Sequence, residues 1–177
     1  MNFPKLVLLI INIIGGAAVL GSYILGLKTH AGGADVLWGG VPLRIRPAYG
    51  VSMILSAFGY LAFAYFTLFK LDSANTVIAG KLGYGFLSIL FVLILGASAL
   101  WMPLTYVYVG HPTISIWIVI RIVLLIVGLS SCTLVWALLN LKNGASGLAY
   151  WLAIAGSAYF AFHTSVLDAL TWPVLFR

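Results

Sequence analysis

Two ionisable side chains lie inside long apolar runs, where a charge is costly. Arg121 lies in the run 115–139 and Asp168 in the run 148–172. A charged side chain in hydrocarbon normally faces the interior of a helical bundle and finds a partner there. Both residues lie about one to two turns from the same end of a bundle whose helices alternate in direction. We therefore expect them to form an ion pair or share a water, as a clamp between helices or part of a ligand site, unless Arg121 extends outward to the membrane surface.

Helical spacing predicts which residues of the run 148–172 face inward. At 100° per residue one face carries a mostly polar and aromatic stripe, namely Tyr150, Ser157, Ala161, Thr164, Asp168 and Trp172. His163 stands five residues before Asp168 and would point about 140° away from it, beside Tyr159. The spacing thus disfavours a His–Asp catalytic pair, and predicts that His163 makes a hydrogen bond between helices.

The remaining candidate residues are aromatic or polar and are expected near the same end of the bundle. Tryptophan and tyrosine often lie at the headgroup level of a membrane, and Tyr49 fits such a belt. Tryptophans beside charged groups can also line a pocket, with indoles against the ligand and Arg121, Asp168 and Thr105 fixing a polar group. The candidate ligand-binding residues are Trp38, Trp101, Pro103, Thr105, Trp117, Arg121, Tyr159, Thr164, Asp168 and Trp172.

The composition indicates the elements that must position these residues. Hydrophobic side chains make up 63% of the 177 residues and charged ones 7%, with a mean hydropathy of +1.16. Such a surface would not stay dissolved, which excludes soluble nucleic-acid binders, secreted disulfide scaffolds and disordered tails. We predict an all-α integral membrane protein, a five-transmembrane-helix bundle forming a single domain over 1–177. The expected spans are 6–27, 49–69, 83–101, 115–139 and 148–172, with a long first loop 28–48.

Orientation and assembly are less determined by the sequence. The net charge of +6 indicates Lys and Arg residues at the edges of a membrane. Each side of the expected bundle carries four such residues, so the charge count identifies neither the orientation nor the membrane. Gly15 and Gly16 are packing residues or a candidate homodimer interface. The expected partners are the lipid bilayer and a hydrophobic small molecule, with no nucleic acid.

Several kinds of chemistry lack support in the sequence. Cys132 has no second cysteine to pair with. A triad of Ser98, His163 and Asp168 is disfavoured by the facing argument above. The three histidines lack metal-ligand spacing; they are His30, His111 and His163. We therefore assign no catalytic residue, no metal and no certain cofactor.

One short segment resembles a known family. Leu100, Trp101 and Pro103 resemble the Leu-Trp-x-Pro motif in the third helix of the translocator protein / tryptophan-rich sensory protein (TspO/MBR) family. The five expected spans and a long first loop carrying Trp38 and Pro42 agree with that layout.

Three departures from the family pattern make the relation remote. Trp38-Gly-Gly-Val-Pro42 replaces the usual Trp-x-Pro-Pro run, and Ser98 stands where asparagine is expected. Asp168 is the nearest polar residue where the family has a second asparagine.

The resemblance implies a bundle whose cavity opens beneath the first loop, with that loop as a lid over a tryptophan-lined pocket. Relatives bind tetrapyrroles, sterols and other flat lipophilic molecules, as transporters, sensors or weak photo-oxidative enzymes, so the resemblance implies a bound tetrapyrrole or lipid. Two other functions are open. One is a small integral subunit or assembly factor of a larger membrane complex, and the other is a lipid-modifying enzyme that uses Asp168 or His163 as a general acid.

Overall fold

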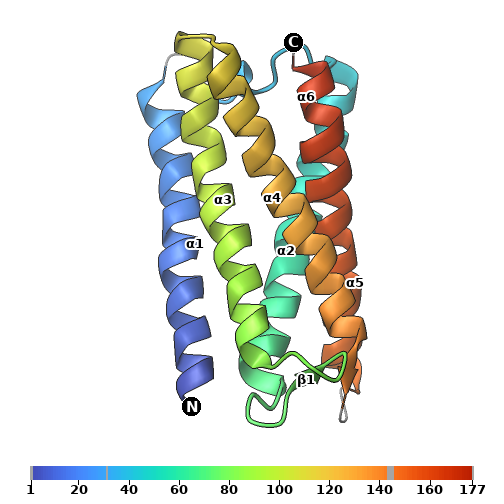
Figure 1. The fold of residues 1–177 in the computed structure, drawn as a ribbon. Coiled ribbons are helices and arrows are strands. Elements are labelled where there is room, and N and C mark those ends of the chain that lie inside the picture. The colour runs from blue at the N-terminus through green and yellow to red at the C-terminus, as the bar shows by residue number, and fades with distance from the viewer. Residues whose placement is uncertain (1, 31, 143–145, 177) are drawn as a thin grey trace.

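Long helices that alternate in direction make up most of this chain. The computed structural model describes residues 2–30, 32–142 and 146–176. Its main helices are α1 (Phe3–Thr29), α2 (Arg46–Tyr65), α3 (Tyr84–Gly110), α4 (Ile114–Leu139) and α5 (Leu148–Phe162), shown in Figure 1. Two π-helical segments and a short helix extend them; these are η3 (Phe66–Lys70) after α2, and η4 (His163–Thr171) with α6 (Trp172–Leu175) after α5.

The apolar helices are compatible with a multi-pass membrane protein. Within the described residues, four helical stretches are long and apolar enough to cross a membrane, namely Phe3–Thr29, Leu43–Lys70, Tyr84–Gly110 and Ile114–Leu139. Large apolar side chains such as Phe58 and Leu129 are about two-thirds exposed, as lipid-facing positions should be. The all-α membrane class is thus supported, while a fifth crossing by α5, η4 and α6 stays a prediction.

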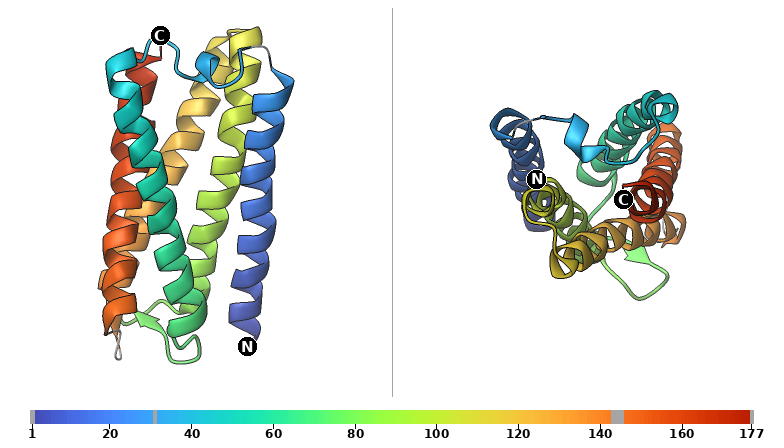
Figure 2. Two further views of the ribbon diagram at one scale, coloured as in Figure 1. Left: turned by 180° about the vertical axis from the view of Figure 1, so that it is seen from behind. Right: turned by 90° about the horizontal axis from the view of Figure 1, so that it is seen from above.

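Alternation brings distant segments together at two ends of the bundle. The first loop, the α3–α4 turn and α6 lie at one end, which we call the first-loop end (Figure 1). The start of α1, the α2–α3 connection and the α4–α5 connection lie at the other, the N-terminal end. The first loop contains two 3-10 turns, η1 (Asp35–Leu37) and η2 (Leu43–Ile45), and crosses from α1 to α2 above the bundle (Figure 2).

The helices pack in the order α1, α3, α4, α5, α2. Each neighbouring pair in that order makes an extensive contact, whereas α1 packs mainly on α3. Within α1 only Leu8 and Gly26 are buried. Tyr60 of α2 donates a hydrogen bond of 2.6 Å to Asn12 Oδ1 of α1 in the half of the bundle nearer the N-terminal end. Because it has a single large contact, α1 is the least embedded of the five long helices.

Small residues allow the closest helix approaches. A Cβ added at Gly156 of α5 would lie 2.8 Å from the carbonyl oxygen of Gly59 in α2, so neither position has room for a side chain. On α1, a Cβ at Gly15 would lie 2.7 Å from Leu95 Cδ1, while Gly16 meets nothing within 4 Å. Gly15 is therefore a packing residue against α3. A dimer through the Gly16 side stays a prediction.

The third helix is longer than the sequence predicts. Its expected span ends at Trp101 because Pro103 follows, yet α3 continues through Pro103 to Gly110. Proline removes one backbone hydrogen bond, but hydrocarbon gives the chain no water to replace the others, so the helix continues. The Thr105 hydroxyl donates to the Trp101 carbonyl oxygen at 2.8 Å and supplies a local side-chain bond beside the proline. The first loop is also shorter than 28–48, because α1 ends at Thr29 and α2 begins at Arg46.

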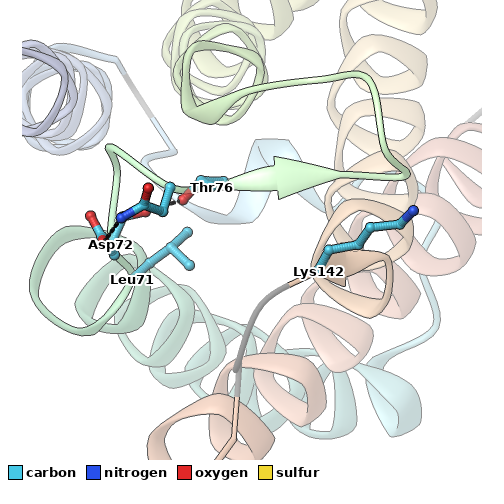
Figure 3. Close-up of a pocket in the computed structure, with 5 residues that line it drawn as sticks. Leu71, Asp72, Thr76 and Lys142 are labelled. Carbon is cyan, nitrogen blue, oxygen red and sulfur yellow. Dashed lines mark hydrogen bonds between the residues drawn. The ribbon is translucent and has the colours of Figure 1, made fainter.

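Two short strands and a turn form the N-terminal end. Strand β1 (Val77–Ile78) pairs antiparallel with β2 (Leu141–Lys142). Asp72 accepts hydrogen bonds from the Asn75 side chain and the Ala74 amide, and these bonds hold the pKa of Asp72 below its usual value. An open pocket of about 380 Å³ lies beside this turn, and its Lys142 side chain extends away from Asp72 (Figure 3). The acid of this pocket, Asp72, thus already has its hydrogen-bond partners within the turn.

Candidate functional site

Aromatic side chains fill the space beneath the first loop. We call Val41, Trp117, Trp172 and Phe176 the lid cluster; each is less than 10% exposed. The ring centroid of Trp172 lies 4.4 Å from that of Phe176 and 6.0 Å from that of Trp117.

Two hydrogen bonds fasten the first loop onto this cluster. Trp172 Nε1 donates to the Leu37 carbonyl oxygen at 3.0 Å, and the Gly40 amide donates to the Phe176 carbonyl oxygen at 3.3 Å. Trp117 and Trp172 therefore come together as expected, but as tightly packed residues that hold the loop in place.

Asp168 and His163 lie on the same side of η4, which corrects the facing argument from sequence. His163 Nε2 and Asp168 Oδ2 are 3.5 Å apart. In a π-helix the backbone bonds join residues five apart, so positions i and i+5 share a side instead of pointing about 140° apart. Thr171 shows the same spacing, because its hydroxyl donates to the Val166 carbonyl oxygen at 2.7 Å. The predicted separation of His163 from Asp168 is therefore wrong, and the reason is the local change of helix type.

A buried polar chain continues from His163 to α2. His163 Nδ1 lies 2.8 Å from Ser52 Oγ, and Tyr159 donates to the same oxygen at 3.1 Å. The expected hydrogen bond of His163 between helices is confirmed. The hydrogen bonds can all point in one direction along this chain. The Tyr159 hydroxyl then donates to Ser52 Oγ, the Ser52 hydroxyl donates to His163 Nδ1, and the proton on His163 Nε2 points at Asp168. We call Asp168, His163, Ser52 and Tyr159 the polar chain.

The polar chain contains a serine, a histidine and an aspartate in contact, with Ser52 in place of the Ser98 considered from sequence. Ser52 and His163 are each 5% exposed, and Ser52 Oγ already bonds both Tyr159 and His163. A nucleophile must be reachable by the carbon it attacks. The arrangement therefore joins α2 to α5 and η4 more readily than it offers an attacking oxygen. Sequence reasoning did not single out Ser52.

Arg121 does not pair with Asp168. Among the residues that the structure describes, Arg46 lies 3.8 Å from Asp35 and His163 lies 3.5 Å from Asp168, whereas Arg121 is exposed and contacts neither acid. The side of η4 that touches α4 carries Ser165, whose hydroxyl donates to the Gly128 carbonyl oxygen at 3.1 Å. Asp168, three residues further along, points to another side of η4. The expected ion pair is thus wrong, because the two side chains are at similar depth but face apart.

A substitution tests this separation. Arg121→Gln should change the thermal stability of the detergent-solubilised protein by less than about 0.5 kcal/mol, because exposed positions without partners tolerate change. The measurement is a thermal unfolding curve, with Asp168→Asn run in parallel. A loss of stability in Arg121→Gln equal to that of Asp168→Asn, and not additive with it, would show that the two residues are coupled after all.

Tyrosine and tryptophan side chains from other helices lie around the segment that carries Asp168, whose side chain is 31% exposed. Tyr49 of α2 donates a hydrogen bond of 3.0 Å to the carbonyl oxygen of Leu167, the residue before Asp168, and Tyr23 of α1 is near enough to Asp168 for an electrostatic interaction. Tyr23 contacts Trp101 of α3 edge to face at 6.2 Å, and Tyr49 contacts Trp38 of the first loop at 5.9 Å. We call these five residues, Tyr23, Trp38, Tyr49, Trp101 and Asp168, the Asp168 site.

The Asp168 site differs from the lid cluster in having surface left uncovered. Tyr23, Trp38, Trp101 and Asp168 are all half-buried, and they come from α1, the first loop, α3 and η4. Trp101 Nε1 is buried without a hydrogen-bond partner. An unsatisfied buried donor is uncommon in proteins and calls for an explanation, and an acceptor atom of a ligand would be one.

The other sequence candidates lie outside this group. Pro103 is exposed on α3. Thr105 and Thr164 are buried and donate to carbonyl oxygens of their own helical segments, Trp101 and Phe160. Tyr23 was missed and Tyr49 was assigned to the headgroup belt, because their distance from Asp168 depends on how three helices pack.

No group of three or more His, Cys, Asp or Glu that could hold a metal occurs within the described ranges 2–30, 32–142 and 146–176. Comparison of the chain with protein-family models, with curated proteins and with solved structures gives no match. The resemblance to the TspO/MBR family therefore stays a prediction that depends on the sequence features given above.

Proposed function

We propose that this chain is a membrane protein that binds or transports a hydrophobic ring-bearing molecule at the Asp168 site, beneath the first loop. The observation that carries the proposal is a carboxylate, 31% exposed, in a segment that contacts Tyr49 of α2 and Trp101 of α3. The rings of these two residues in turn contact Trp38 of the first loop and Tyr23 of α1. Ligand sites are mostly apolar walls with a few polar groups that fix orientation. An intramembrane acid that is not fully covered by its own protein is a functional candidate by default.

The two groups of aromatic residues would have different roles. The lid cluster is packed, so its rings would hold the first loop in position without touching the ligand. Tyr23, Trp38 and Trp101 keep exposed ring surface and would contact the flat body of the ligand. Trp101 Nε1 would donate to an acceptor atom of the ligand, which would satisfy its buried N–H.

The resemblance noted from sequence suggests the class of ligand. A tetrapyrrole, a sterol or a similar lipid has a flat apolar body with polar groups at its edge, which matches indole faces beside a carboxylate. The first loop would act as the lid, fastened by the bonds from Trp172 to Leu37 and from Gly40 to Phe176.

Fluorescence quenching tests the proposal. In detergent, protoporphyrin dimethyl ester, an uncharged tetrapyrrole, should quench tryptophan emission saturably, and Trp101→Leu should weaken binding about tenfold, which corresponds to about 1.4 kcal/mol. The loss is expected because the substitution removes both the ring surface and the Nε1 donor. Trp151→Leu is the matched control, since Trp151 is 62% exposed near the N-terminal end.

Two results would contradict the proposal. One is linear, unsaturable quenching by both a porphyrin and a fluorescent sterol after correction with a detergent blank. The other is an affinity that Trp101→Leu and Trp151→Leu reduce equally.

A further inference from the structure

The Asp168 site contains a carboxylate but no permanent cation to balance it. Among the described residues the basic group that contacts Asp168 is His163, whose Nε2 lies 3.5 Å from the carboxylate. Around this acid α1 contributes Tyr23, α2 contributes Tyr49 and Ser52, α3 contributes Trp101, and α5 contributes Tyr159 through the polar chain. The cation of α4, Arg121, is exposed and does not pair with Asp168.

The first loop adds one acid and one base that largely balance each other. Arg46 pairs with Asp35 at 3.8 Å and donates to the Val41 carbonyl oxygen at 3.0 Å. Its guanidinium carbon also lies 5.6 Å from the centroid of the Trp38 ring. This contact shows that one indole of the Asp168 site already accepts a cation on its face.

Aromatic rings and a carboxylate favour the same kind of ligand charge. The faces of Trp and Tyr rings carry negative electrostatic potential, so they attract cations and repel anions. A carboxylate in a low-dielectric setting strengthens that preference. A cation of the protein itself would remove the preference, but His163 is a neutral acceptor of the Ser52 hydroxyl whenever the polar chain runs from Tyr159 towards Asp168.

We infer that the Asp168 site takes a lipophilic organic cation, an amine or quaternary onium compound whose charge lies near Asp168 and whose apolar body lies against Tyr23, Trp38 and Trp101. This inference rests on the proposed function and names the charge class of the ligand of that same site.

Binding of such a cation is coupled to release of a proton. An uncompensated charge inside a bilayer is costly, so the empty site holds a proton on the Asp168–His163 pair. When the cation arrives, the O–H bond of the protonated carboxyl breaks, the electron pair stays on the carboxylate and the proton leaves to water. One positive charge enters and one leaves, so the site keeps its net charge. Cation affinity therefore rises with pH.

Two probes of nearly equal size and opposite charge test the inference. Tetraphenylphosphonium and tetraphenylborate are titrated into the full chain in an uncharged detergent, with heat and tryptophan emission as readouts. We expect the cation to bind at least about tenfold more tightly than the anion, a difference of about 1.4 kcal/mol. In weakly buffered solution its binding should release one proton, and its affinity should be higher above neutral pH than below.

Variants assign the effect to one carboxylate. Asp168→Asn should abolish both the preference for the cation and the proton release, and Asp168→Glu should retain them. Asp35→Asn is the control, because the Asp35 side chain is 89% exposed and lies outside the site. If Asp168→Asn fails to fold, proton release by the wild-type chain still tests the inference.

The outcomes separate the inference from the proposed function. Equal binding of both probes, tighter binding of the anion, or cation binding without proton release overturns the inference. Saturable porphyrin quenching with no tetraphenylphosphonium binding overturns it as well, while leaving the proposed function in place. No saturable binding of any of the three probes overturns both.

Discussion

Replacing Trp172 by alanine should detach the first loop and lower the free energy of unfolding by about 3–5 kcal/mol, the usual cost of removing a buried large aromatic side chain. Trp172 is 4% exposed and contacts the rings of Trp101, Trp117 and Phe176. It also donates the hydrogen bond to Leu37 that fastens the loop. The substitution thus removes a central ring of the lid cluster together with an anchor of the lid.

Hydrogen exchange of the loop amides and the unfolding curve measure the two parts of this effect. In Trp172→Ala, amides 35–41 should exchange faster, while those of the N-terminal end keep the wild-type rate. Trp172→Phe keeps a ring and loses the N–H donor, so it should cost less, with about 1 kcal/mol for the hydrogen bond. Trp151→Ala, at an exposed position, is the control. Unchanged loop protection in Trp172→Ala would mean that the loop is held by other contacts.

Hydropathy predicts the helices of this chain well because lipid imposes a simple requirement. A backbone that cannot bond to water must bond to itself, so each apolar run of about 20 residues becomes a helix. The runs 6–27 and 115–139 match α1 and α4 to within a few residues. The end of α3 was placed too early, since Pro103 stops helices in water more effectively than in hydrocarbon.

The arrangement of the candidate site was less predictable, because it depends on side-chain facing. A helical wheel assumes 100° per residue, and the π-helical segment η4 breaks that assumption between His163 and Asp168. Depth along the bundle was correct for Arg121 and Asp168, but depth does not determine direction. Tyr23 reaches Asp168 from α1 through tertiary packing, which no local pattern in the sequence encodes.

The inward stripe of the last run shows where periodicity still works. Tyr150, Ser157 and Ala161 precede the π-helix and are buried, as the wheel predicts. From residue 163 onward the wheel correctly places Thr164 and Trp172 inward. It wrongly places His163 on another side of the helix from Asp168. The error thus begins where the helix type changes, which makes η4 the feature of the fold that most needs a direct test.

A double-mutant cycle between His163 and Asp168 provides that test. His163→Leu should lower the free energy of unfolding by about 3 kcal/mol, because it leaves Ser52 without an acceptor and Asp168 without the imidazole that it contacts. Asp168→Leu removes the other partner, and the double variant should cost less than the sum of the two single variants. We expect a coupling of about 1–2 kcal/mol, measured by unfolding in a mixed detergent.

The sign and size of this coupling depend on the helix type. In a regular α-helix the two side chains would point about 140° apart, and their substitutions would add without coupling. In the π-helix they lie 3.5 Å apart and must couple. Tyr150→Phe with Asp168→Leu is a control pair, because Tyr150 donates to the Leu138 carbonyl oxygen and is not part of the polar chain. Additivity in the His163 cycle, with each single variant folded, would therefore contradict both the π-helical register and the contact of His163 with Asp168 that depends on it.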